Sequence, residues 1–211
     1  YVTDTVLQNT LTRLRNEVIP MNLKPVTYTV IIDQENTNCE TACTYADDAI
    51  GMTKGASAWD NVPIFKDIRP CVFENGEVNY YLNPDNWDEQ VDGTASDLTG
   101  GDGDVMIEFP KFAYRIYTDE NNKVYVSVSN DATVIAADNR FTYDAFSRLS
   151  EGDLDYFYHG AYQGYVDANN KLRSIAGVVP TGNKTIDAFR TAAQANGSHY
   201  QQNTYAQVKA I

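Results

Sequence analysis

Hydrophobic and polar positions alternate along much of this chain, and the alternation predicts that strands dominate the fold. The clearest stretch runs from Val26 to Ile32, where apolar side chains recur at every second position, as in a strand with one face against a core. Asn75-Gly76 separates two further apolar runs, and this dipeptide strongly favours a hairpin turn. By the same reasoning the predicted strands are 26–32, 68–73, 78–82, 105–109, 112–117, 123–129 and 156–165.

The segments between these strands are polar or lack a clear period. Residues 33–44 are polar and irregular, and residues 83–104 are rich in Asp, Gly and Asn, which predicts loops. Residues 130–155 follow neither the strand nor the helix period. Within 123–129 we expect Val124, Val126 and Val128 to share one face of the strand, because side chains alternate between faces.

Two segments have the period of a helix. Residues 3–19 carry apolar side chains at spacings of 4, 3 and 4 on an otherwise polar background, which is a short heptad seam. Thr185 is a favourable N-cap for a second helix that extends to Asn196, with Gly197 after it. The seam consists of Leu7, Leu11, Leu14 and Val18, and the stripe of the second helix consists of Ile186, Phe189, Ala192 and Ala193.

These patterns divide the chain into a neck and a domain. A seam so narrow suits a coiled coil, and a helix so short is not stable alone, so we expect residues 1–24 to be an oligomerisation neck and linker. Pro20 and Pro25 bracket that linker. Residues 25–211 predict an α+β, mostly β domain. The chain opens at Tyr1, and Thr204 to Ile211 read as the first turns of a helix, so we expect an internal segment of a longer protein.

Composition excludes several classes of partner. The net charge of −13 among 211 residues repels phosphate backbones, so we expect no nucleic-acid partner. No apolar run approaches the ~18 residues that a membrane helix needs, and the N-terminus carries no secretory signal pattern. We therefore expect no membrane insertion.

The chain has 3 cysteines and 2 histidines, which are too few and too scattered to form a closed structural metal site. Cys39 and Cys43 fit no common zinc spacing, so we predict neither a metal nor a cofactor. An odd count argues against a complete disulfide framework, although one bridge beside one free thiol stays possible. Three reduced thiols are the default expectation, in agreement with assembly in a reducing cytoplasm.

Catalysis has little support in the residues, and we predict no catalytic residue. No nucleophile elbow is present. The 29 acidic residues make carboxylate pairs inevitable, so a glycan hydrolase with two acids about 5–10 Å apart stays the alternative. Asp97 to Asp104 resembles a calcium loop in composition, but no glutamate closes it, and a flexible turn is the simpler interpretation.

The 15 tyrosines are the most unusual feature of the composition. Tyrosine combines a rigid apolar ring with a polar tip and so suits recognition surfaces, but it is also a common strand residue. The densest aromatic stretch is Tyr156 to Tyr165. If it is a strand, Phe157 and its alternate neighbours His159 and Ala161 face the core, and the tyrosines between them are exposed. This predicts a ligand-binding surface of Tyr158, Tyr162 and Tyr165.

An ordered series of phrases carries a resemblance to a known family. The phrases are Thr44 to Ala49, Trp59, Ile64 to Cys71, Asn79 to Pro84, Gly103 to Phe112, Gly160 to Tyr162, Leu172 to Gly177, Pro180, Thr185 to Arg190 and Ala195 to Gly197. The series, over residues 26–211, resembles tail proteins of phages and prophages of Gram-positive and gut bacteria. Their distal domains are similar to the C-type lectin fold, in the variant shared with formylglycine-generating enzymes and phage variable adhesins.

The resemblance implies attachment to a host cell and no enzymatic activity. Formylglycine-generating enzymes depend on a late cysteine pair, whereas no cysteine follows Cys71. Calcium-dependent sugar binding is not implied either. Lectins that bind sugar through calcium use the tripeptides Glu-Pro-Asn or Gln-Pro-Asp together with Trp-Asn-Asp. This chain has Trp59-Asp60-Asn61 and Asn86-Trp87-Asp88, which contain similar residues in a different order. In the group, the chain continues past this point through a Trp- and Leu-rich helix to a Gly-rich end, so we expect the domain to be truncated at Ile211.

The resemblance also implies a location and partners. It indicates a structural component of the virion, in the tail tip or fibre, that contacts other tail proteins and a host glycan or protein; a capsid-borne fibre of the same fold is an alternative. Phage fibres are symmetric, so the neck predicts a homotrimer. Because lectin-like folds present ligands from their C-terminal half, a second candidate surface is His199, Tyr200 and Tyr205.

Overall fold

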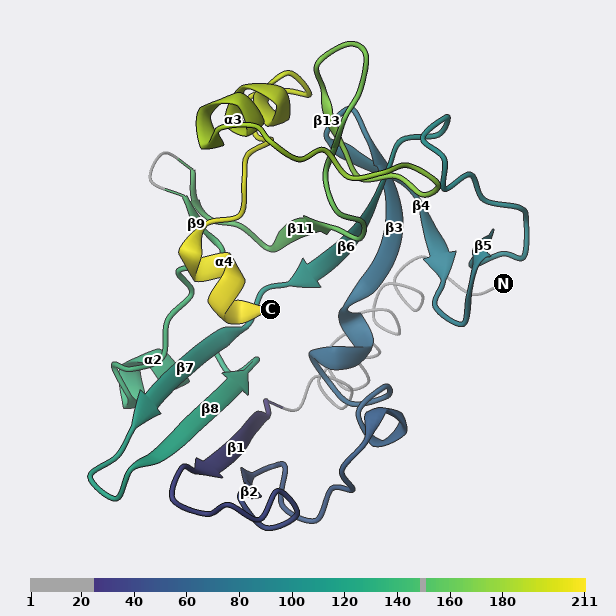
Figure 1. The fold of residues 1–211 in the computed structure, drawn as a ribbon. Helices are drawn as coiled ribbons and strands as arrows, with labels where there is room; N and C mark the ends of the chain where they lie inside the picture. The colour runs from purple at the N-terminus through teal and green to yellow at the C-terminus, as the bar shows by residue number, and fades with distance from the viewer. Residues whose placement is uncertain (1–24, 149–150) are drawn as a thin grey trace, which may run out of the picture. The chain divides into compact units, whose positions relative to one another are not determined.

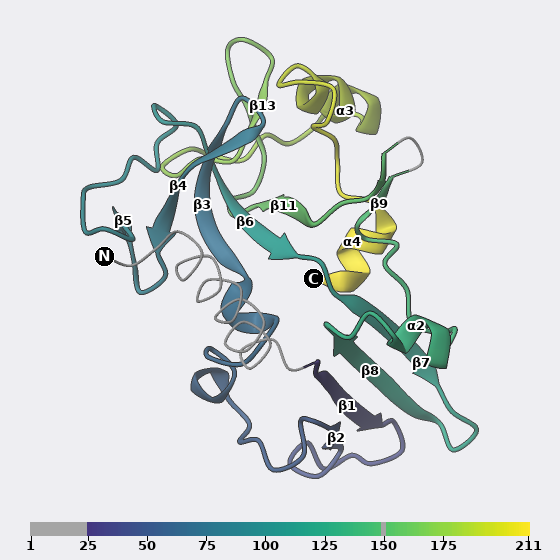
Figure 2. The ribbon, with the colours of Figure 1, turned by 180° about the vertical axis from the view of Figure 1, so that it is seen from behind.

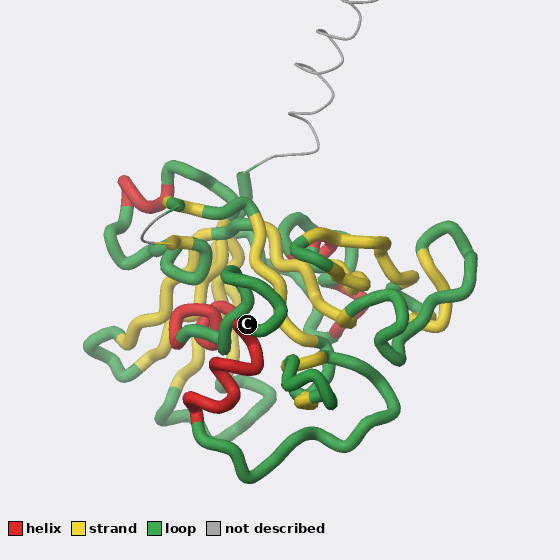
Figure 3. The backbone as a smooth tube through the Cα atoms, turned by 90° about the horizontal axis from the view of Figure 1, so that it is seen from above, coloured by secondary structure: helices red, strands yellow, loops and turns green. Residues whose placement is uncertain are grey.

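The computed structural model describes residues 25–148 and 151–211 (Figure 1). It divides into two compact units. The first unit comprises residues 1–63 and 112–142, and the second comprises 64–111 and 143–211. The predicted neck with its seam of Leu7, Leu11, Leu14 and Val18 lies outside the described residues. The predicted α+β, mostly β class is confirmed, since strands far outnumber helices (Figure 3).

The first unit is built on an antiparallel sheet of 4 strands in the order β2-β1-β8-β7. Its strands are β1 (Thr27–Asp33), β2 (Cys43–Asp47), β7 (Ala113–Thr118) and β8 (Lys123–Ser129); its short helices are η1 (Ala56–Ala58) and α2 (Val134–Ala137). The predicted strands 26–32, 112–117 and 123–129 are therefore confirmed. β2 was not predicted, because a short strand at a sheet edge has one partner and shows no alternation in its sequence.

The face of this sheet that is most buried is polar. Thr29, Ser127 and Ser129 are all buried. The hydroxyl of Thr29 lies 2.7 Å from that of Ser127, and the hydroxyl of Thr27 lies 2.9 Å from that of Ser129. Val124, Val126 and Val128 point to the opposite face, as predicted, and are half-buried. The hydroxyls satisfy one another, which makes their burial tolerable.

The second unit holds an antiparallel sheet of 5 strands in the order β11-β6-β3-β4-β5 (Figure 2). Its strands are β3 (Arg69–Glu74), β4 (Glu77–Asn83), β5 (Asn86–Gln90), β6 (Asp104–Pro110) and β11 (Tyr156–Gly160). The smaller elements are η2 (Phe65–Asp67), β9 (Ser147–Arg148), β10 (Gly152–Asp153), β12 (Tyr165–Val166), β13 (Leu172–Arg173), α3 (Ile186–Gln194) and α4 (Tyr205–Ala210).

The tight turn of this sheet was predicted correctly from its local sequence, whereas one loop and one strand were predicted only in part. Asn75 and Gly76 both have positive φ, at 53° and 91°, the conformation that a tight hairpin requires and that their side chains permit. The predicted loop 83–104 is wrong in part, because β5 adds a polar edge strand to the sheet. The predicted strand 156–165 is too long, because β11 ends at Gly160 and the chain bends before β12.

Apolar side chains form the core on one face of this sheet. Val72, Leu82 and Val105 are its centre. Nearby, the ring of Phe157 stacks on that of Phe109 with centroids 4.9 Å apart. Phe157 is buried, so the prediction that it belongs to the core is confirmed. The residues packed around the centre are Tyr80, Trp87, Leu98, Ala161 and Tyr162.

The two longer helices of the second unit begin with side-chain caps. Thr185 accepts a hydrogen bond from the backbone N–H of Ala188, as its N-cap prediction requires, and α3 lies beside β13 (Figure 1). Thr204 and Gln207 form a capping box at α4. Ala192 and Ala193 are buried, but the predicted stripe residue Ile186 is 67% exposed, because it occupies the first turn. None of the helices in the described ranges combines the length and apolar character needed to cross a membrane.

Candidate functional site

The most unusual side chain in the second unit is a buried glutamate. Glu108 lies in β6 between apolar neighbours, and its side chain is 2% exposed. The register pairs it with Arg69 of β3 on one side and with Tyr158 of β11 on the other. Paired residues of antiparallel strands share a face, so the fold places these three side chains in one row across the sheet. Tyr81 of β4, which pairs with Cys71, joins the row diagonally.

The carboxylate of Glu108 is held by three donors. Its Oε1 accepts a hydrogen bond of 2.6 Å from Nη2 of Arg69, and its Oε2 accepts bonds of 2.9 Å from the hydroxyls of Tyr81 and Tyr158. Nη2 of Arg69 also donates to the hydroxyl of Tyr81 at 2.8 Å. A buried charge is tolerated only with such pairing. We call these four residues, Arg69, Tyr81, Glu108 and Tyr158, the Glu108 cluster.

The electrostatics of the Glu108 cluster oppose proton transfer. Burial, followed by the hydrogen bond to Glu108, raises the pKa of Tyr81 to about 12, and the same causes raise the pKa of Tyr158. Burial, then the charge of Glu108, raises the pKa of the Cys71 thiol to about 12. Burial, the largest cause, lowers the pKa of Arg69, but the hydrogen bond to Glu108, the charge of Glu108 and two nearby tyrosines together raise the pKa overall. At neutral pH both tyrosines and the thiol therefore keep their protons, and the thiol is a weak nucleophile.

Part of the cluster faces outward. The side chain of Arg69 is 45% exposed, and its guanidinium carbon lies 3.8 Å from the centroid of the Tyr81 ring, which is a cation–π arrangement. Tyr156 lies two residues before Tyr158 on the same face of β11 and is 45% exposed. The arrangement is a rigid surface of one arginine and tyrosine rings, suited to holding a ligand.

The predicted binding residues lie in several places. Tyr158 and Tyr200 meet around Phe73, with ring centroids 4.4 Å and 6.1 Å from it. Tyr162 packs in the core against Trp87. Tyr165 lies in the small β12–β13 sheet.

Their exposure differs from the prediction. Tyr158, Tyr162 and Tyr165 are all half-buried, because their rings pack against neighbouring elements, so the expectation that they are exposed is wrong. Tyr200 is half-buried too, and its hydroxyl accepts a bond from the backbone N–H of Gly76. By contrast Tyr205 is 78% exposed.

His199 remains exposed at 77%, with Nδ1 3.3 Å from a carboxylate oxygen of Glu151. Of the six predicted residues, only Tyr158 belongs to the Glu108 cluster.

Sequence reasoning missed Arg69, Tyr81 and Glu108. A signal for Glu108 was present, since it is the only acid in the apolar run from Val105 to Phe109. A carboxylate inside such a strand requires a charged or hydrogen-bonding partner. The identity of those partners depends on strand register, which the run itself does not encode.

The acidic loop from Asp97 to Asp104 bends before β6, as its interpretation as a turn requires, and its carboxylates accept hydrogen bonds. Asp97 accepts bonds from the backbone N–H and hydroxyl of Thr99 at 2.7 and 2.6 Å. Asp102 accepts from the hydroxyl of Tyr80, and Asp104 accepts from Nε of Arg173, each at 2.9 Å. These acids shape the loop and anchor it to the sheet.

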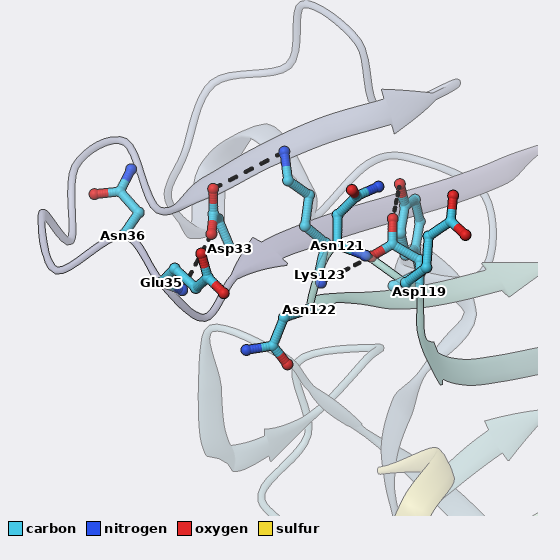
Figure 4. A pocket seen from close by; sticks show the side chains of 9 residues that line it. Asp33, Glu35, Asn36, Asp119, Asn121, Asn122 and Lys123 are labelled. Atoms are coloured by element: carbon cyan, nitrogen blue, oxygen red, sulfur yellow. Dashed lines mark hydrogen bonds and ion pairs between the residues drawn. The ribbon is translucent and has the colours of Figure 1, made fainter.

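A separate pocket of about 820 Å³ lies in the first unit (Figure 4). It is formed by the turn after β1 and by the β7–β8 turn. Asp119 accepts two backbone bonds of 2.9 Å, from Asn121 and Lys123, and Nζ of Lys123 lies 3.9 Å from Asp33. The pocket is lined by Asp33, Glu35, Asn36, Asp119, Glu120, Asn121, Asn122, Lys123 and Tyr125. Its acids disfavour an anionic ligand, and two of them hold the turns in place.

The three cysteines are free thiols, as the default interpretation of the sequence expected. Cys39 is exposed, Cys43 is half-buried and Cys71 is buried.

Comparison of the chain with protein-family models, with curated proteins and with solved structures gave no match. Its function must therefore be argued from its own residues.

Proposed function

We propose that this chain is a non-catalytic, adhesive building block of a bacteriophage virion, a tail-tip or fibre module that attaches the particle to its host cell. The Glu108 cluster is the observation that carries this proposal. It fixes Arg69 and Tyr81 in a rigid, partly exposed surface, and rigid presentation favours binding because little freedom is lost when a ligand arrives.

The cluster also favours adhesion over catalysis. A general acid or base works best with a pKa near the operating pH, whereas the pKa of Tyr81 is raised to about 12 and that of Tyr158 is also raised. The carboxylate between them already accepts three hydrogen bonds. Its donors hold it in place and leave it poorly suited to move a proton.

The ordered phrases of the sequence supply the phage context of the proposal. They favour a domain of the C-type-lectin-like fold for residues 25–211, and the α+β, mostly β architecture is compatible with it. The seam in residues 1–24 favours a trimeric neck that joins other tail proteins. In this proposal the module is made in the host cytoplasm and resides in the virion.

Adsorption to cells tests the proposal directly. Fluorescently labelled chain is mixed with a panel of Gram-positive and gut bacteria, and cell-bound fluorescence is measured. We expect saturable binding to some strains, and at least about tenfold weaker binding for Tyr81→Ala, by the usual cost of an interface anchor. Arg190→Gln is the matched control, because Arg190 pairs only with exposed Asp187 on α3.

The same preparations test the competing hydrolase function. Cell-wall polysaccharide from the binding strains is incubated with the chain, and newly formed reducing ends are counted. We expect none above the level of the heat-treated chain. Steady release of oligosaccharides would replace the adhesive role with a depolymerase, and absence of binding to every strain would refute attachment.

A further inference from the structure

The fold engages only part of Arg69. Both of its hydrogen bonds, to Glu108 and to Tyr81, leave from Nη2. Within residues 25–148 and 151–211, Nε and Nη1 have no hydrogen-bond partner, and the side chain is 45% exposed. A guanidinium carries five N–H donors, so most of the donors of Arg69 remain for water or a ligand.

Two contacts hold the guanidinium group of Arg69 in a fixed orientation. Glu108, at 2% exposure, holds Nη2 from within the sheet, and the Tyr81 ring supports the guanidinium at 3.8 Å. An arginine held in this way loses little conformational freedom when it binds a ligand. The two free nitrogens do not share an edge, because both edges with parallel N–H groups include Nη2, so Nε and Nη1 can each donate a single hydrogen bond to a carboxylate oxygen.

The charge of the chain narrows the choice of anion. A net charge of −13 disfavours multiply charged ligands, because repulsion grows with the charge of the ligand. A single carboxylate carries less charge than a phosphate group. Tyr156 adds an exposed ring on the same face, close enough to Arg69 to interact electrostatically with it, and such a ring can contact the apolar C–H groups of a sugar.

We propose that this surface binds an acidic oligosaccharide, in which Arg69 pairs with the carboxylate of a uronic-acid-type sugar and Tyr156 contacts the sugar ring. The proposal rests on the adhesive function proposed above and names its ligand class. It assigns Tyr81 and Glu108 a positioning role, since both act on the ligand through Arg69.

Calorimetric titration with defined sugars tests the assignment. The probes are two oligosaccharides that each carry a single uronic acid, one a glucuronate and one a galacturonate, and each is compared with its carboxyl-methylated, neutral form. We expect the acid form of at least one sugar to bind at least about tenfold more tightly than its ester, as the loss of a charge-assisted contact implies. Equal binding of acid and ester, or no binding of any probe, would overturn the proposal.

Variants at two positions separate the roles of charge and shape. Arg69→Gln is expected to abolish the preference for acid over ester, and Arg69→Lys to keep only part of it, because lysine lacks the planar fork. Tyr156→Ala should weaken acid and ester alike. Arg190→Gln should bind as the unmodified chain does, and melting temperatures of all variants show whether each one folds. Unchanged acid preference in a folded Arg69→Gln would contradict the proposal.

Two further arms distinguish other outcomes. Competition by inorganic phosphate at the same concentration as the acid sugar would identify a phosphate site and refute the carboxylate assignment. Cell adsorption that persists in Arg69→Gln would refute the acidic-sugar ligand while leaving the adhesive function intact. Loss of adsorption by every form of the chain would instead refute the adhesive function.

Discussion

The two large sheets each bury polar side chains on one face, but with different chemistry. In the first unit the buried groups are neutral hydroxyls, such as Thr29 and Ser127, which pair with each other. In the second unit the buried group is the charged Glu108, which needs an arginine and two tyrosines. A hydroxyl needs only one good partner, whereas a buried charge must gather several. In the second arrangement the buried charge itself holds a half-exposed arginine, since Glu108 bonds to Arg69, which is 45% exposed.

Removing the charged centre should have the largest effect. Glu108→Ala leaves Arg69 and two tyrosine hydroxyls without their shared acceptor, and we expect the free energy of unfolding to fall by about 3 kcal/mol, the lower end of the range for broken buried pairs, because Arg69 is half-exposed. Urea denaturation measures the change. Glu77→Ala, at the exposed end of β4, is the control and should cost less than about 0.5 kcal/mol. A loss for Glu108→Ala as small as the control's would show that the cluster is not a structural centre.

Alkaline pH should weaken the second unit. The pKa of Tyr81 is raised to about 12 in the folded chain by burial and by its bond to Glu108, against an ordinary value near 10. A raised folded pKa contributes stability that is complete below the unfolded value and is lost as pH rises from about 10 to 12. Melting temperature as a function of pH should fall in this window. Tyr81→Phe should flatten the decline, and an equally steep decline in that variant would contradict the assignment.

The hydroxyl pairs of the first unit should respond more moderately. Ser127→Ala removes the acceptor of Nε of Arg115 and one of two partners of the Thr29 hydroxyl, which still donates to Asp47, and we expect a loss of about 1 kcal/mol. Urea denaturation again provides the measurement. The double variant Thr29→Val with Ser127→Ala replaces both hydroxyls of one pair, so it should cost less than the sum of the two single changes. Additive losses would show that the pair does not act as a unit.

Acid should produce the smallest change, and in the first unit. Hydrogen bonds from Arg140, and then from Arg115, hold the pKa of Asp138 well below its ordinary value. A lowered folded pKa contributes stability that is present above the unfolded value, about 4, and is lost as pH falls below it. The side chain of Asp138 is 19% exposed and that of its partner Arg140 is 49% exposed, so the effect should be modest and reduced by salt. A pH titration of melting temperature between about 5 and 2 should show a shallower decline for Asp138→Asn.

The local parts of the fold were predictable from local residues. The alternation from Val26 to Ile32 corresponds to β1, Asn75-Gly76 forms the tight turn between β3 and β4, and Thr185 caps α3. Each depends on side-chain period or on backbone preferences within a few residues. The edge strands β2 and β5 escaped prediction because pairing with one neighbour imposes no hydrophobic period.

The candidate site was only partly predictable. Tyr158 was singled out as an exposed residue of an aromatic strand, yet its hydroxyl points to Glu108 and its ring packs on Phe73. The alternation along β11 correctly placed Phe157 and Tyr158 on opposite faces of the sheet, but it does not predict which residues cover each face. That depends on which strands lie beside β11 and on the segments packed over the sheet.

What the sequence determined by itself is the strands with a hydrophobic period, such as β1, the tight turn at Asn75-Gly76 and the N-cap of α3. The tertiary structure alone decided that β6 lies between β3 and β11, and so brought Glu108 to Arg69, 39 residues away, and to Tyr158, 50 residues away. Period and turn chemistry act over neighbouring residues, whereas the partners of a buried charge are set by the register of strands distant in the chain.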